Sequence, residues 1–118
     1  MFLNVWTPDP APGGRRPVMV FVHGGAFAFG SGSDAETEGH RLARHGDVVV
    51  VTLNHRVNAF GYLSLARLDP RFPDSGNAGQ LDLVLALQWV RANIAAFGGD
   101  SGRVTLFGQS GAAARSRP

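Results

Sequence analysis

Three short apolar runs, separated by segments of helical pattern, constrain the fold of this chain more than any other feature. They cover residues 18–22 (VMVFV), 48–53 (VVVVTL) and 104–107 (VTLF). Unbroken apolar runs of this length, rich in β-branched and aromatic residues, are typical of strands buried on both faces of a parallel sheet. Strands that alternate with helices join into such a sheet through right-handed crossovers. The pattern predicts an α/β fold with a mostly parallel sheet and flanking helices.

The segments between these runs contain two expected helices. Ser33 and Glu36 have the spacing of a capping box, which predicts a helix over about 34–45 that stops at Gly46. A longer helix is predicted over 79–97, where two apolar rows recur at spacings of three and four, so that it is largely buried. Residues 3–6 resemble a short strand, and residues 54–78 a long irregular connection.

The polar residues that follow the three strands are the first candidates for a functional site, because chemistry in parallel sheets sits beyond the carboxyl ends of the strands. The three strands are followed by His23-Gly24-Gly25, Asn54-His55-Arg56 and Gly108-Gln109-Ser110. We expect all three groups to lie near one another.

Ser110 stands where a catalytic nucleophile is mounted in many hydrolases. A serine on a sharp strand-to-helix turn is pushed toward substrate, and the residues two positions before and after it must be small. Gly108 meets this need, whereas Ala112 stands where the G-x-S-x-G pattern has glycine. The alternative is an ordinary surface turn after a strand.

The glycine-rich loop that begins at His23 (HGGAF) supplies the second half of the same chemistry. Attack by a serine on an ester creates an oxyanion, which preorganised backbone N–H groups stabilise. Gly25 and Ala26 are the expected donors, with the Gly111 N–H as a third. The alternative is a flexible glycine loop.

The four histidines have different expected environments. We expect His23 to order the glycine loop rather than act as a base, and His55 to line the site. His40 and His45 are expected in solvent, on the surface of the first helix.

Composition argues against several other classes of function. The chain has no cysteine and no cluster of histidines and carboxylates with ligand spacing, so we expect no metal and no cofactor. The net charge is only +2 and the arginines are scattered, which argues against nucleic-acid binding. Gly30-x-Gly32-x-x-Ala35 resembles a dinucleotide fingerprint, but it begins too far after its strand.

The sequence shows no membrane span and no signal peptide. A cytoplasmic location is therefore the default expectation, and nothing in the pattern indicates an oligomeric state.

Taken in order, the blocks LNVWTP, PVMVFVHGGAFAFGSGS, VVVVTLNHRVNAFGYLSL and GNAGQLDLVLALQWVRANIAAFGGDSGRVTLFGQS resemble the type-B carboxylesterases, the α/β-hydrolase family that includes the cholinesterases. The resemblance implies a partial α/β-hydrolase fold and hydrolysis of a small-molecule carboxylic ester through an acyl-serine. It also implies that Ser110 is the nucleophile and that Gly25, Ala26 and Gly111 form the oxyanion hole.

The chain departs from the family pattern at several positions. At the turn it reads GQSGAA, as though one alanine of G-x-S-A-G-A were dropped, and His55 and Asn58 stand near a family tyrosine and glycine. Residues 1–118 correspond to the amino-terminal part of one domain, ending just after the nucleophile elbow.

In α/β-hydrolases the acid and the histidine of the triad follow the serine in the chain. None of residues 111–118 is Asp, Glu or His, so we expect these 118 residues alone to be inactive or nearly so. We also expect low stability and aggregation through exposed strand edges such as 48–53. The alternatives are a non-catalytic relative that binds an acyl ligand or a partner, or a product without function.

Overall fold

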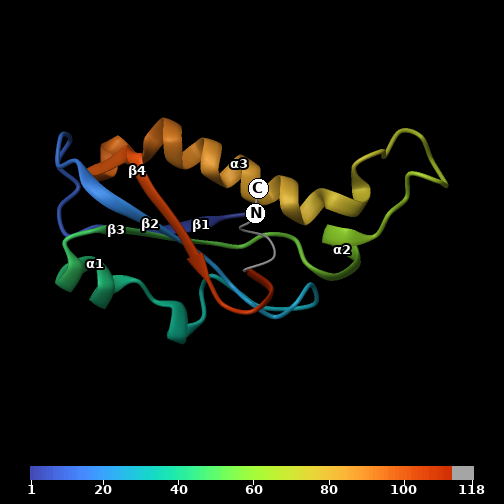
Figure 1. Cartoon of the computed structure of the whole chain (residues 1–118), viewed down its shortest axis with the longest axis horizontal. Coiled ribbons are helices and arrows are strands. Elements are labelled where there is room, and N and C mark those ends of the chain that lie inside the picture. The colour runs from blue at the N-terminus through green and yellow to red at the C-terminus, as the bar shows by residue number, and fades with distance from the viewer. Residues whose placement is uncertain (113–118) are drawn as a thin grey trace.

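A computed structural model describes residues 1–112, and its centre is a four-stranded sheet (Figure 1). The strands are β1 (Leu3–Trp6), β2 (Arg16–Val22), β3 (Val49–Leu53) and β4 (Gly99–Gly108), in the order β1-β3-β2-β4. β2 is parallel to both β3 and β4, whereas β1 pairs antiparallel with β3. The predicted α/β fold with a mostly parallel sheet is therefore confirmed.

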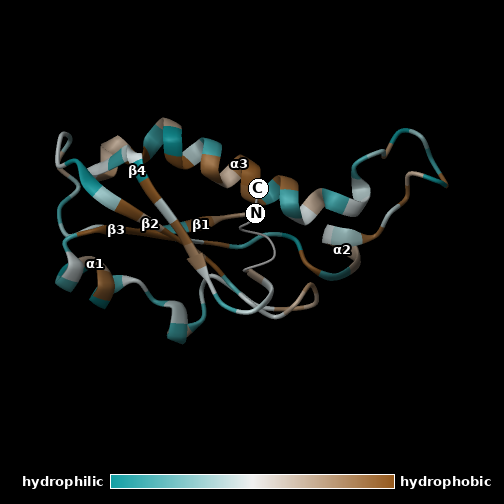
Figure 2. Ribbon diagram, in the orientation of Figure 1, coloured by the Kyte–Doolittle hydropathy of each residue, from teal (hydrophilic) through white to brown (hydrophobic). Residues whose placement is uncertain are grey.

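Two helices cover opposite faces of this sheet (Figure 1). α3 (Ala78–Asn93) packs on one face and α1 (His40–Gly46) on the other. Successive side chains of a strand point to opposite faces. Accordingly, Val49 and Val51 pack in the cluster under α3, while Val50 joins Ala43 of α1. The strands carry most of the apolar character of the ribbon (Figure 2).

The helix predicted over 34–45 is wrong in its first half. The chain instead forms a short 3-10 turn, η1 (Ala35–Thr37), and α1 starts only at His40. The carboxylate of Glu38 accepts the His40 backbone N–H at 2.8 Å, a bond that a continuous helix would make to a backbone carbonyl. No capping box forms, because the residue before η1 is Asp34 and its side chain makes no capping bond.

The long helix is confirmed, but only one of its two apolar rows is buried. α3 continues into the 3-10 turn η3 (Ile94–Phe97) and ends at Gly98, whose φ is +81°. Leu83, Val90 and Ile94 face the sheet and are buried. Leu81 and Leu85, from the second row, are exposed.

The third predicted strand exists but is not buried. β4 lies at the edge of the sheet, and Thr105 and Leu106 are exposed. The run 48–53, expected to offer an exposed edge, is in fact central: β3 pairs with β1 on one side and β2 on the other, and all five of its residues are buried. The edge strands among residues 1–112 are β1 and β4.

The connection expected over 54–78 contains two short helical pieces. α2 (Asn58–Tyr62) lies next to α3, and η2 (Ser75–Asn77) leads directly into it. Between these pieces the chain extends away from the sheet (Figure 1).

Candidate functional site

The ends of the three parallel strands meet at one level. Val22, the last residue of β2, pairs with Leu53 of β3 on one side and with Gly108 of β4 on the other. The glycine loop, the segment Asn54–Arg56 and the turn at Ser110 therefore leave the sheet at the same edge, as the sequence predicted.

Ser110 occupies a tight turn directly after β4. Its backbone φ is 55°, a left-handed conformation that is uncommon for residues other than glycine, and its side chain is exposed. The Ala112 N–H donates to the Gln109 carbonyl at 3.1 Å and closes the turn. A β-carbon on Gly108 would lie 2.5 Å from that of Ala112, which is fully buried, so both positions must be small.

The glycine loop lies directly against this turn. A β-carbon on Gly24 would lie 3.5 Å from the β-carbon of Ser110 and 2.9 Å from the Gln109 carbonyl oxygen. On the other side of the serine, a β-carbon on Gly111 would lie 2.7 Å from the carbonyl oxygen of Ala26. The structure thus brings together Ser110, Gly111 and the loop that carries Gly25 and Ala26.

The loop holds an unusual backbone conformation at both expected donors. Gly25 has a φ of 93° and Ala26 a φ of 54°. The Gly25 carbonyl accepts the Ala28 N–H at 3.1 Å, which makes a turn of the segment. The loop is therefore bent sharply at the residues proposed to face the substrate oxygen.

Asn58 is a contact of this loop whose role the motif reasoning did not foresee. Its backbone N–H donates to the Phe27 carbonyl at 2.5 Å, which ties the start of α2 to the glycine loop. Its φ of 59° is in the left-handed region, where asparagine is tolerated better than most residues. An asparagine at this position is therefore the sequence signal for the left-handed turn.

His23 and His55 form a buried stack behind the loop. Their ring centroids are 4.3 Å apart and their planes differ by 9°. His55 therefore lies beside His23 at the strand ends, while His40 and His45 are exposed on α1 as predicted.

Arg56 and Asp82 make a second anchor that the sequence reasoning missed. Asp82 interrupts the apolar pattern of the long helix, yet it is buried. Its carboxylate accepts the Arg56 backbone N–H at 2.8 Å and both Nε and Nη2 of the guanidinium. Burial acts to raise the pKa of Asp82, but the hydrogen bonds and charge of Arg56 outweigh it and lower that pKa below its ordinary value. The sequence offered one signal for this contact: Asp82 is the single acidic residue of a largely apolar helix.

An apolar hollow of about 510 Å³ opens beside the glycine loop, begins at Ala26 and continues along Phe27, Tyr62 and Leu63. The rings of Phe27 and Tyr62 pack edge to face, with their centroids 4.8 Å apart. This hollow offers an apolar surface beside the proposed oxyanion donors.

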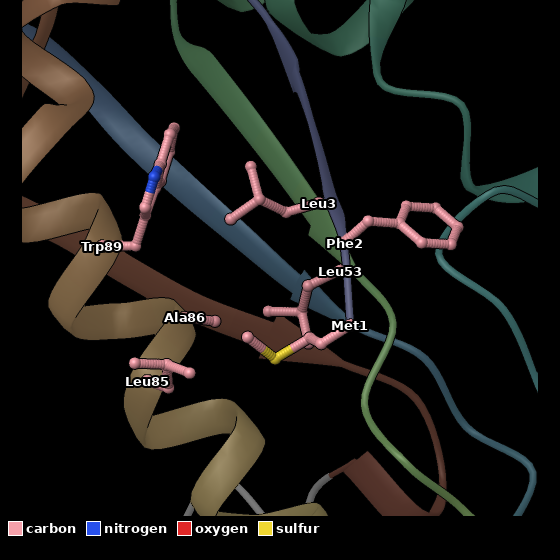
Figure 3. A pocket seen from close by; sticks show the side chains of 7 residues that line it. All are labelled: Met1, Phe2, Leu3, Leu53, Leu85, Ala86 and Trp89. Carbon is pink, nitrogen blue, oxygen red and sulfur yellow. The ribbon is translucent and has the colours of Figure 1, made fainter.

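The second hollow, of about 380 Å³, lies between β1 and α3 (Figure 3). Leu85, Ala86 and Trp89 line it from the helix. None of the residues proposed for ester chemistry borders it.

The geometry does not favour the dinucleotide alternative. The segment after Gly32 forms the three-residue turn η1, not a helix whose N-terminus could bind a pyrophosphate. Within residues 1–112 no three His, Asp or Glu side chains gather in a way that could hold a metal ion. In the same part of the chain, no helix combines the length and apolarity needed to cross a membrane.

A mostly parallel sheet with a strained serine turn and a glycine loop at one edge defines an α/β-hydrolase. The model of the carboxylesterase family matches residues 1–116. The chain therefore belongs to the carboxylesterase family.

Individual relatives agree with this assignment. The chain is 49% identical over 110 residues to the para-nitrobenzyl esterase of Bacillus subtilis, covering 93% of this chain and 22% of that protein. It is 50% identical over 114 residues to cholinesterase 1 of Branchiostoma lanceolatum, covering 97% of this chain and 30% of that protein.

A solved structure shows the same similarity in three dimensions. A carboxylesterase of Geobacillus stearothermophilus superposes with a TM-score of 0.93 at 51% identity, covering 97% of this chain and 24% of that one. The chain thus spans less than a third of the length of each of these three relatives.

Proposed function

We propose that this chain supplies the nucleophile and the oxyanion hole of a carboxylic ester hydrolase. The observation that carries the proposal is the close approach of the glycine loop to the turn on both sides of the exposed Ser110: Gly24 lies against Gln109, and Gly111 lies against Ala26. Membership of the carboxylesterase family supports the reaction class.

In the proposed reaction, Ser110 Oγ attacks the carbonyl carbon of the ester and loses its proton to a base. The carbonyl oxygen becomes an oxyanion that accepts hydrogen bonds from the N–H groups of Gly25, Ala26 and Gly111, each worth about 3 kcal/mol in such sites. The intermediate expels the alcohol and leaves an acyl-serine, which water then hydrolyses.

The base and its orienting acid are not among residues 111–118, which contain no Asp, Glu or His. A serine hydroxyl without a base is a weak nucleophile at neutral pH. We therefore expect the 118 residues on their own to be inactive toward esters, and the same residues to be active once a family member provides the rest of the domain.

A chimera tests this proposal directly. This chain would replace the matching 110 residues of the Bacillus subtilis para-nitrobenzyl esterase, with Ser110→Ala as the matched control. We expect p-nitrophenyl butyrate hydrolysis by the chimera, none by its Ser110→Ala variant and none by the 118-residue protein.

A folded chimera without activity would contradict the assignment of the nucleophile. Turnover by the 118-residue protein that disappears in Ser110→Ala would instead contradict its expected inactivity. Saturable ester binding by that protein without turnover would favour the non-catalytic alternative.

A further inference from the structure

The two buried histidines extend the pairing of their strands beyond the edge of the sheet. His23 directly follows Val22, the last residue of β2. Val22 pairs with Leu53 of β3, and His55 comes two residues after Leu53. The side chains are only 3% and 5% exposed, and the 9° angle between their planes is that of a parallel stack. The contact therefore joins the two segments just beyond the ends of β2 and β3.

His23 fills the space enclosed by the glycine loop. Its Nδ1 lies 2.8 Å from the Gly24 carbonyl oxygen at the start of the loop. At the far end, Gly30 approaches so closely that a β-carbon there would overlap His23 Nδ1. Gly25 and Ala26 lie between these two contacts, so the position of the His23 ring sets the position of the loop.

His55 is anchored from the other side by the long helix. Its Nδ1 lies 3.1 Å from the carbonyl oxygen of Arg56. The backbone N–H and the guanidinium of Arg56 in turn donate hydrogen bonds to the buried carboxylate of Asp82 in α3. A continuous series of contacts thus leads from α3 through His55 to His23.

We propose that His55 is a positioning residue for the oxyanion loop, acting through its stack on His23. The inference rests on the proposed function, because it assigns the loop to the substrate oxygen. The loop needs such support, since Ala26 is held at a φ of 54° that an unsupported chain seldom adopts. The flat face of the His55 ring provides part of this support, so another flat ring can keep the stack on His23 and a branched aliphatic side chain cannot.

The kinetic test uses the chimera described above with three single variants. His55→Phe keeps a flat ring, His55→Leu keeps an apolar side chain without one, and His45→Leu on exposed α1 is the matched control. Misplacing catalytic groups by about 1 Å costs about 100-fold, so we expect His55→Leu to lower kcat by roughly 10- to 100-fold. KM should change little, because the loop acts on the transition state. His45→Leu should stay within about threefold of the parent, and His55→Phe, which keeps the stack but loses the Nδ1 contact with Arg56, should lose clearly less kcat than His55→Leu.

A folded His55→Leu chimera with the parent kcat would overturn the proposal, as would an equal loss in His55→Phe. If His55→Leu does not fold, His55→Met serves instead, because its flexible side chain adapts to the space left by the ring. The expected loss of kcat is the same.

A second measurement does not depend on catalysis. In the 118-residue protein, ¹⁵N relaxation would report the order parameters of the Gly25 and Ala26 amides. We expect values of about 0.85 in the parent, similar values in His55→Phe, and values below about 0.6 in His55→Leu. An inactive parent chimera would refute the proposed function, while these amides would still decide the positioning role. Unchanged order parameters in His55→Leu would refute that role.

Discussion

Gly108 and Ala112 lie against each other across the turn that presents Ser110. A β-carbon added to Gly108 would lie 2.5 Å from the β-carbon of Ala112 and would also overlap the Val22 carbonyl oxygen. We expect Gly108→Ala to lower the free energy of unfolding by about 1–3 kcal/mol, the usual cost of overpacking.

Urea denaturation of the 118-residue protein measures this change, with Gly46→Ala as control. Gly46 is the last residue of α1, and the nearest side-chain atom to an added β-carbon would be 3.4 Å away, so the control should be neutral or slightly more stable. Adding Ala112→Gly should recover only part of the loss, because the Val22 carbonyl remains in place.

The left-handed backbone of Ser110 predicts a conflict between stability and function. With its φ at 55°, any side chain there is strained, and glycine alone relieves the strain. We expect Ser110→Gly to be more stable than Ser110→Ala by about 0.5–1 kcal/mol after the entropic cost of glycine, although both lack the proposed nucleophile. Thermal melts of the two variants side by side measure the difference, and a more stable Ser110→Ala would contradict it.

The anchor between Arg56 and Asp82 predicts a loss of stability in acid. The pKa of Asp82 is lowered in the folded state, so its contribution is complete above the unfolded value of about 3.9. Below that pH the contribution decreases, and it is lost once the pH passes the lower folded pKa.

We expect Asp82→Asn to cost about 1–3 kcal/mol at pH 7, typical of hydrogen bonds to charged groups, and progressively less toward pH 2. Urea denaturation across this range measures the trend, with Asp74→Asn on an exposed loop as control. A difference between wild type and Asp82→Asn that did not shrink in acid would contradict the assignment.

The exposed edge of β4 predicts where the protein associates with itself. Leu106 is 37% exposed and pairs with the fully buried Val20, so an apolar strand borders solvent. We expect Leu106→Lys to raise the concentration at which light scattering appears, because charge on an edge strand blocks further pairing.

A lysine at Val51 should instead unfold the protein. Val51 is fully buried in the central strand β3, and a lysine there would bury an unpaired charge, so circular dichroism should show unfolding. Equal scattering by wild type and Leu106→Lys would locate the association elsewhere.

The sequence predicted most accurately which residues lie together beyond the ends of the parallel strands. Continuous apolar runs located β2 and β3, and the parallel topology that they imply places His23, Asn54 and Ser110 at one edge of the sheet. Rules of this kind transfer well, because the pairing of strands leaves few alternatives once their direction is known.

Burial and side-chain partners could not be predicted in the same way. The run that forms β4 is as apolar as a central strand, and only the order of strands shows that it lies at the edge. Asp82 reads as a solvent-facing residue until Arg56, 26 positions away, is brought beside it. Glu38 accepts the His40 N–H, although the sequence predicted an unbroken helix there, in which a backbone carbonyl would accept it. The first two misses concern contacts between segments far apart in the sequence, which no local pattern contains, and the third is a local turn that the helical pattern concealed.

The pairing of Val22 with strands on both sides has a consequence for how the site forms. β2 is made early in synthesis, but its second neighbour, β4, is separated from it by more than seventy residues of chain. Contacts between such distant segments are slow to form, because the entropy of closing the intervening loop is lost before any bond is gained. We infer that the proposed nucleophile and the proposed oxyanion donors come together only when β4 docks on β2, late in the folding of these strands.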